Sequence, residues 1–186
     1  DIMIELVTHR SPRLRGAAVR GLAQLDPDLF LVVLSGLPQD PQWEVRAELA
    51  RAFALVAPDV AAFRLTMLLD DQDRRVIPAV LRGLVGVGAP NAEEVLLAHL
   101  LNEDVVVRKT AAVLLGDLAA RTAVEPLAVS YRAASAEPSY LARAAVVDSL
   151  AKIGGPLALD VLREALDDAD WAVRLRAAEH LAILDP

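Results

Sequence analysis

Apolar residues recur along this chain at helical spacing, and the helical pattern itself repeats every 31 residues. Arg15 and Arg46 are 31 positions apart, and two further steps of 31 reach Ile77 and Arg108. Arg143 follows after 35 positions and Arg174 after 31, so one interval carries four additional residues. We call residues 15, 46, 77, 108, 143 and 174 the anchor positions. Apolar residues three, four, seven and ten positions after each anchor form one face of an α-helix.

The positions seven and ten residues after the anchors are the most regular. Those at seven are Leu22, Phe53, Leu84, Leu115, Leu150 and Leu181, and those at ten are Leu25, Val56, Val87, Leu118, Ile153 and Leu184. The residues four before the anchors are Ser11, Gln42, Asp73, Asp104, Ser139 and Asp170. Five of these six side chains can cap a helix start. The pattern therefore predicts one helix around each anchor.

Prolines predict a second helix in each repeat, because proline is tolerated at the first helical position. They are Pro27, Pro58, Pro90, Pro156 and Pro186, and in the fourth repeat Thr122 is expected to cap instead. The first helices of the repeats are expected over residues 2–8, 27–37, 58–69, 90–101, 123–133 and 156–166. The repeats themselves span about 1–25, 26–56, 57–88, 89–119, 120–154 and 155–186. Neither helix of a repeat can bury its apolar face alone, so the expected fold is all-α, an α-α superhelix (solenoid) of six helical hairpins.

Two places depart from the repeat. Ile77 replaces the anchor arginine, Pro78 follows it, and Gly83, Gly86 and Gly88 weaken the same helix. We expect that helix to start late or to bend. The four additional residues fall in the turn 134–138, which is expected to protrude.

The repeat resembles the HEAT family, through Asp104 to Gly116 (DVVVRKTAAVLLG) and Asp170 to Ala178 (DWAVRLRAA). Its period is shorter than the roughly 40–47 residues of eukaryotic HEAT arrays. It is closer to the compact bacterial repeats named after phycobilisome lyases. The resemblance implies that second helices line a concave surface. It also implies that the anchor arginines, Arg15, Arg46, Arg108, Arg143 and Arg174, pair with acidic groups in the turns.

Composition and charge narrow the functions. Hydrophobic residues make up 55% and aromatic residues 4% of the 186 residues, so small aliphatic side chains must form the core. The net charge of −7 disfavours nucleic acid as a partner, and no apolar run is long enough for a membrane span. Cysteine is absent, which excludes disulfides and thiol chemistry. A cytoplasmic location is favoured and a periplasmic one is allowed, while the sequence predicts no oligomeric state.

Arginines five residues after the first three anchors form the most prominent polar pattern. Arg20, Arg51 and Arg82 point away from the apolar face and are expected to form a strip along the exposed groove. The strip either binds carboxylates or is a solvated surface that pairs with acids such as Glu48. Trp43, Tyr140 and Trp171 share the position three before an anchor. Aromatic residues there either anchor an interface or cover the turn and the end of the next repeat's core, and we expect the second.

The sequence shows no pattern typical of a catalytic or cofactor-binding site. His9, His99 and His180 occupy different repeat positions without metal-ligand spacing, so no metal is expected. The His-Glu pairs of HEAT-fold di-iron hydroxylases are missing, because only the reversed Glu179-His180 occurs. No phosphate-binding glycine loop or activated serine is present, and no cofactor is expected.

The sequence therefore predicts a non-catalytic scaffold that binds a protein or peptide, with an acidic one favoured, on its concave face. The start at Asp1 and the helix-starting Pro186 lead us to expect a segment of a longer chain. One alternative is a substrate-presenting region of a larger enzyme, such as a bacterial cyclophilin-type peptidyl-prolyl isomerase. Another is a nucleic-acid binding module, since HEAT-like DNA glycosylases use a basic groove.

Overall fold

The computed structural model describes residues 2–184, and in these residues all regular structure is helical. The chain divides after Ala92 into two compact units. No helix of the described residues is long and apolar enough to cross a membrane.

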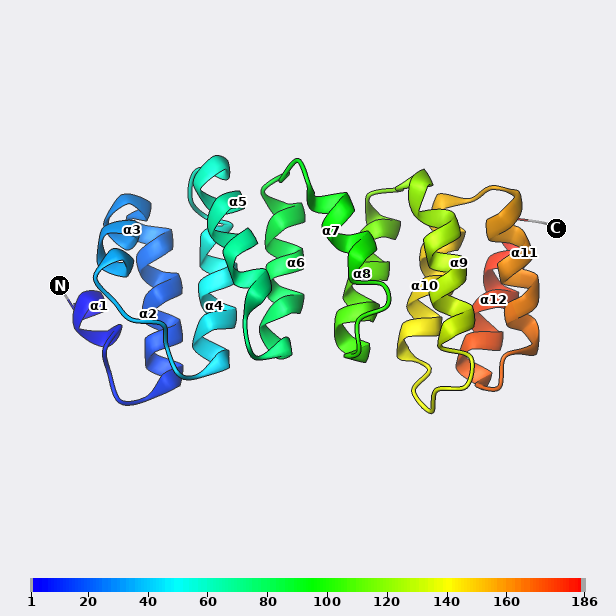
Figure 1. Cartoon of the computed structure of the whole chain (residues 1–186), viewed down its shortest axis with the longest axis horizontal. Coiled ribbons are helices and arrows are strands. Elements are labelled where there is room, and N and C mark those ends of the chain that lie inside the picture. Colours follow the sequence, from blue (N-terminus) through cyan, green and yellow to red (C-terminus); the bar gives the residue numbers. More distant parts are fainter. Residues whose placement is uncertain (1, 185–186) are drawn as a thin grey trace. The chain divides into compact units, whose positions relative to one another are not determined.

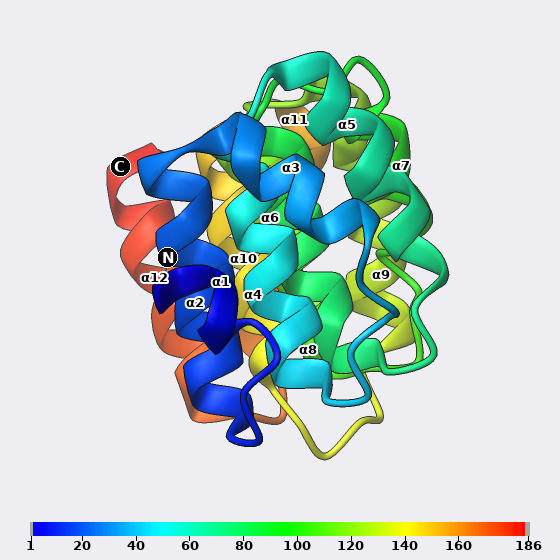
Figure 2. The same cartoon turned by 90° about the vertical axis from the view of Figure 1, so that its left-hand side faces the viewer.

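The first unit contains two layers of helices (Figures 1 and 2). Helices α2, α4 and α6 pack side by side, and α3 and α5 pack against them. The elements are α1 (Ile2–Leu6), α2 (Pro12–Leu25), α3 (Pro27–Ser35), α4 (Trp43–Phe53), α5 (Pro58–Met67), η1 (Leu68–Asp70), η2 (Arg74–Val76) and α6 (Ile77–Gly86), where η marks a 3-10 helix.

The second unit repeats this arrangement. Helix α10 packs between α8 and α12, and α9 and α11 form the second layer. The elements are α7 (Ala92–Ala98), α8 (Val105–Asp117), η3 (Arg121–Ala123), α9 (Val124–Ala133), α10 (Leu141–Ile153), α11 (Pro156–Glu164), η4 (Ala165–Asp167) and α12 (Trp171–Leu184). All-helical structure built from successive hairpins confirms the predicted fold class.

The core follows most of the predicted helical face. Of the six residues seven after an anchor, five are buried and Leu181, near the end of α12, is partly exposed. Five of the six residues ten after an anchor are not buried, because this position falls at or beyond the helix end, and Val56 is the exception. Leu25 is 74% exposed and Leu118 is 44% exposed.

Close packing between α8 and α10 depends on two small residues. Gly116 faces Ser149, and a Cβ atom at Gly116 would lie 2.8 Å from the Ser149 Cα atom. The Ser149 hydroxyl is buried and donates to the Ala112 or Ala145 carbonyl, each 2.7 Å away. Glycine at this point therefore lets the two backbones approach.

Several helix starts agree with the sequence. Pro27, Pro58 and Pro156 each begin a helix, and the Asp104 carboxylate accepts from the Val106 N–H at 2.7 Å. The side chain of Asp26 also caps α3, which the sequence reading missed, by accepting from the Leu29 N–H at 2.9 Å.

One predicted helix start and two predicted caps are wrong, and one predicted start falls outside the described residues. Pro90 lies in a turn closed by the Ala92 N–H on the Ala89 carbonyl, so the helix starts at Ala92. Thr122 lies inside η3 and its hydroxyl donates to the Glu93 carboxylate, so it does not cap. Ser11 precedes α2 but makes no side-chain cap. Pro186 lies outside the described residues.

Helix α6 starts late, as predicted. The 3-10 turn η2 occupies the positions where the other repeats are already α-helical, and α6 begins at Ile77. Pro78 thereby falls in the first helical turn, where its missing N–H costs no hydrogen bond.

We expect faster amide hydrogen exchange in residues 74–88 than in 108–118. A 3-10 start and three glycines give that segment a weaker local hydrogen-bond ladder. Exchange measured at single-residue resolution tests this, and equal protection of the two segments would contradict it.

Candidate functional site

The anchor arginines join successive turns in a recurring geometry. Arg46 Nε donates to Asp71 Oδ2 at 2.6 Å and its Nη2 to Oδ1 at 2.8 Å. Its remaining Nη1 donates to the backbone carbonyl of Asp40 at 2.8 Å. One guanidinium therefore holds the turn of its own repeat and the turn of the next, with bidentate geometry on the carboxylate.

The same arrangement recurs at residues 25 apart. Arg15 binds Asp40 at 2.6 and 2.8 Å, and Arg143 binds Asp168 at 2.9 and 3.2 Å. The carboxylates lie six residues before the next anchor, where each also accepts a backbone N–H two residues on. An acidic residue six positions before an anchor recurs in the sequence, as Asp40, Asp71, Glu137 and Asp168. This position was not singled out from the sequence, although the repeat period would have shown it.

Three anchors depart from this arrangement. Arg108 binds Glu137, which lies 29 rather than 25 positions later because of the four additional residues. The Nε atom of Arg108 has no acceptor in the described residues. Arg174 donates to the carbonyls of Asp168 and Ala169, with no carboxylate partner in residues 2–184. Ile77 carries no charge, and the residue 25 positions later is the uncharged Asn102.

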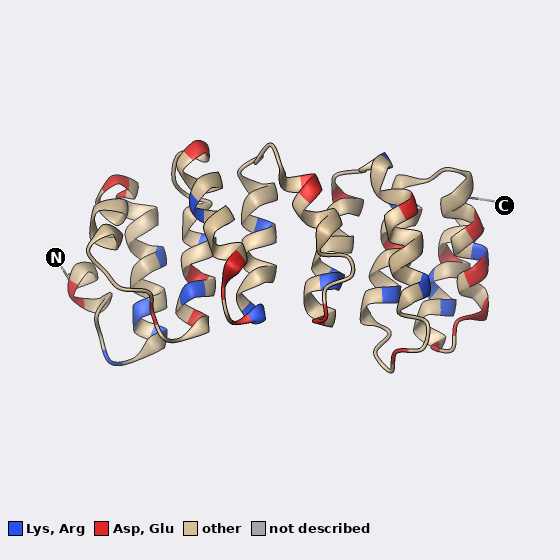
Figure 3. Cartoon of the chain, in the orientation of Figure 1, with Lys and Arg blue, Asp and Glu red and all other residues tan. Residues whose placement is uncertain are grey.

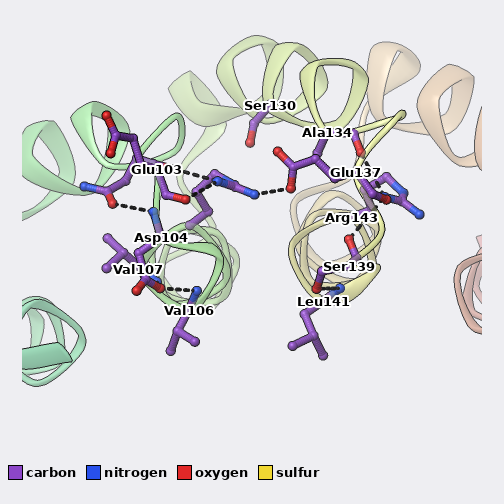
Figure 4. A network of polar contacts seen from close by, with 12 residues as sticks. Glu103, Asp104, Val106, Val107, Ser130, Ala134, Glu137, Ser139, Leu141 and Arg143 are labelled. Carbon is purple, nitrogen blue, oxygen red and sulfur yellow. Dashed lines mark hydrogen bonds and ion pairs between the residues drawn. The ribbon is translucent and has the colours of Figure 1, made fainter. Parts of the chain in front are cut away.

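The protruding turn 134–138 is fixed at its base. Ser135, Ala136 and Pro138 are exposed, whereas the Glu137 side chain points toward α8 and its backbone carbonyl accepts from Arg143 at 3.0 Å (Figure 4). The tip is therefore available to a partner while the base is held.

The carboxylates of this arrangement have lowered pKa values. Burial alone would raise the pKa of Asp168, but hydrogen bonds from Arg143, the Asp170 N–H and Tyr131 together lower it. Asp40 and Asp71 have pKa values lowered in the same way by Arg15 and Arg46. Burial and the Asp168 carboxylate raise the pKa of Tyr131, so its hydroxyl stays protonated as a donor.

We expect the free energy of unfolding to fall in acid. Because these pKa values are lower in the folded state, the stabilisation is complete above the ordinary Asp pKa of about 3.9. It is lost as the pH falls through the lower folded-state values. Urea unfolding at neutral pH and at successively lower pH measures this, and Asp168→Asn should show a shallower pH dependence. Parallel curves for the two proteins would contradict the assignment.

A groove between α2 and α4 contains two of the three strip arginines. It has a volume of about 650 Å³ and is lined by Arg13, Arg20, Arg51, Trp43, Glu44 and Glu48, together with small residues of α2 and α4 such as Gly16, Ala17 and Ala47. Arg20 and Arg51 both pair with Glu48, at 3.2 and 2.8 Å. Arg13 is exposed and forms no ion pair or hydrogen bond through its side chain within the described residues.

The third strip arginine lies on the next helix of the same layer. Arg82 on α6 is exposed and donates to the Pro78 carbonyl at 3.0 Å. Basic residues thus mark α2, α4 and α6 in turn (Figure 3). In the second unit the same position on α10, five residues after the anchor, is the acid Asp148. Its carboxylate accepts from Arg176 at 2.6 Å and pairs with His180 at 2.9 Å. The strip of arginines five residues after the anchors is therefore confined to the first unit, because Val113, Asp148 and Glu179 take these positions in the second.

The three aromatic residues have different environments. Arg75 lies 4.4 Å from the Trp43 ring centre, so Trp43 contacts the turn of the next repeat as expected. Trp171 is 68% exposed, which corrects the expectation that it covers a core. Tyr140 is 36% exposed. The role of Trp43 in the wall of the groove was not foreseen, because its sequence position alone does not show which side of the helix start it faces.

The histidines have separate local partners. His9 Nδ1 accepts from the Ser11 N–H at 3.0 Å, and His99 Nδ1 lies 2.8 Å from the Val95 carbonyl. Among the described residues, no group of three His, Asp or Glu side chains has the geometry to hold a metal.

Comparisons with known proteins match both units. A profile described as HEAT repeats matches residues 1–84 and 93–182. An engineered protein of known structure is 22% identical, with a TM-score of 0.59, and the match covers 98% of this chain and 95% of that one. A designed armadillo repeat protein is 17% identical, with a TM-score of 0.58, and the match covers 99% of each chain. No curated protein matches.

The structural likenesses are too distant in sequence to carry function, but they establish the fold as that of a helical-repeat solenoid. The profile covers most of the chain and both units. This chain is a member of the HEAT-repeat family.

Proposed function

We propose that the chain is a non-catalytic scaffold that binds an acidic protein segment in the groove between α2 and α4. Helical-repeat folds generally serve protein interaction, because stacked hairpins present an extended surface. The observation that carries the proposal is the composition of the groove. Arg13, Arg20 and Arg51 line it together with Trp43, while only Glu44 and Glu48 oppose their charge.

The existing ion pairs leave room for a ligand. Glu48 is shared by Arg20 and Arg51, so one carboxylate accepts from two guanidinium groups. Exposed pairs of this kind contribute about 0–1 kcal/mol, so an incoming carboxylate can displace them. Arg13 adds a further cation to the lining, and Trp43 supplies an apolar contact of the kind that anchors interfaces.

Substituting Arg20, Arg51 and Arg82 together by alanine should weaken binding of acidic peptides by about tenfold or more. The matched control is Arg121→Ala with Arg132→Ala and Arg163→Ala, which removes the same charge from the second unit. Fluorescence anisotropy with labelled peptides that combine Asp or Glu with an aromatic residue measures the dissociation constant. The same peptides with Lys in place of the acids should not bind.

Equal affinity of the two triple variants would overturn the proposal. Tighter binding of duplex DNA than of the acidic peptides would instead favour a nucleic-acid module.

A further inference from the structure

A second cavity lies within the first unit and shares no residue with the groove. Its volume is about 630 Å³, and residues of α3, α4, α5 and the turn 37–41 line it together with the turn between α1 and α2. This volume falls within the range of small-molecule sites, about 300–1,000 Å³.

The cavity exists because α3 lacks its last turn. In the third and sixth repeats the residues nine to seven before the anchor form the 3-10 turns η1 and η4. The equivalent residues of the second repeat are Leu37, Pro38 and Gln39, which have no helical structure. A residue before proline is disfavoured in the helical region, so Leu37 leaves the helix and the turn does not form.

The missing turn exposes apolar side chains that other repeats bury. The leucine twelve residues before the anchor is fully buried in four repeats, where it is Leu65, Leu96, Leu162 and, allowing for the four additional residues, Leu127. Its equivalent in the second repeat, Leu34, is partly exposed and lines the cavity. Leu31, Leu49 and Leu68 are also partly exposed on the same wall, and Met67 is 59% exposed. This wall suits an aliphatic ligand.

The charges of the lining favour an anion. Arg15 and Asp40 also line the cavity but neutralise each other through their bidentate pair. Arg10 and Arg64 are exposed, and neither guanidinium forms an ion pair or hydrogen bond within residues 2–184. Two uncompensated cations and an aliphatic wall together select an apolar ligand that ends in a carboxylate.

We propose that this cavity binds an aliphatic carboxylate, with the hydrocarbon chain on the leucine wall and the carboxylate on Arg10 or Arg64. These arginines come from different elements, so single substitutions identify the end at which the carboxylate is held. Binding there does not depend on the groove between α2 and α4, and loss of one site leaves the other intact.

Isothermal titration of the full chain with sodium dodecanoate, below its micellar concentration, tests the proposal. Arg10→Ala with Arg64→Ala should weaken binding by about tenfold or more, and one single variant should account for most of that loss. Met67→Glu, at an exposed position of the lining, should weaken binding without unfolding the chain. Lys109→Ala with Arg121→Ala is the matched control, because both cationic side chains are exposed, unpaired in the described residues and outside both the cavity and the groove.

The cationic analogue dodecyltrimethylammonium should bind at least about tenfold more weakly than dodecanoate. Equal binding of the two would overturn the proposal, as would no binding of dodecanoate or unchanged affinity in the Arg10 and Arg64 double variant.

Discussion

Replacing Arg143 by alanine is expected to lower the free energy of unfolding of the second unit by about 3–5 kcal/mol. Arg143 is 2% exposed and donates to the Asp168 carboxylate and to the carbonyls of Ala134, Glu137 and Ser139. Alanine at this position leaves the buried Asp168 carboxylate without the Arg143 guanidinium, and it removes one hydrogen-bond donor from each of the three carbonyls. Urea unfolding followed by circular dichroism measures the change.

Arg174 provides the matched control, because it occupies the same position of the sixth repeat. It is exposed, and within the described residues it donates only to backbone carbonyls. Arg174→Ala should therefore cost no more than about 1 kcal/mol. Similar losses in the two variants would show that the buried carboxylate pair does not carry the effect.

Gly116→Ala is the second large change, with an expected loss of about 1–3 kcal/mol. The added methyl group would meet the Ser149 Cα and Cβ atoms at 2.8 Å. Because one of these is a backbone atom, α8 and α10 must separate to make room. Thermal and urea unfolding of the variant measure the loss.

Gly86→Ala is the control for helix propensity. Gly86 ends α6, and a Cβ atom there would meet nothing within 4 Å. Alanine should stabilise the chain there by up to about 1 kcal/mol. Opposite signs for the two Gly→Ala substitutions are expected, and a gain in both would refute the close contact.

The sequence predicted what the helix period controls. A buried face, the helix around each anchor and the late start of α6 all follow from spacing and from Pro78. The helix ends were less predictable, because local hydrogen bonds decide them. Leu25 lies at the end of α2 and is exposed, and Pro90 lies in a turn that a proline favours as readily as a helix start.

The candidate site was less accessible from sequence. The position of Arg20 and Arg51 on an exposed face was predictable from the helix period. The ion pair between Arg20 of the first repeat and Glu48 of the second, which Arg51 also contacts, depends on how the two repeats pack. The cavity beside Leu34 could not be predicted, because it results from a turn that fails to form before Pro38. A missing turn is visible only when equivalent repeats are compared in three dimensions.

The turn 134–138 shows where this architecture accepts changes of length. The four additional residues lie between Leu127 and Glu137, so the spacing from the carboxylate to Arg143 stays at six residues, as in the other repeats. Insertions upstream of that carboxylate thus preserve the link between turns, and insertions between it and the anchor would break it. Foreign peptides grafted at Ser135 or Ala136 should therefore be displayed without disturbing the helices on either side.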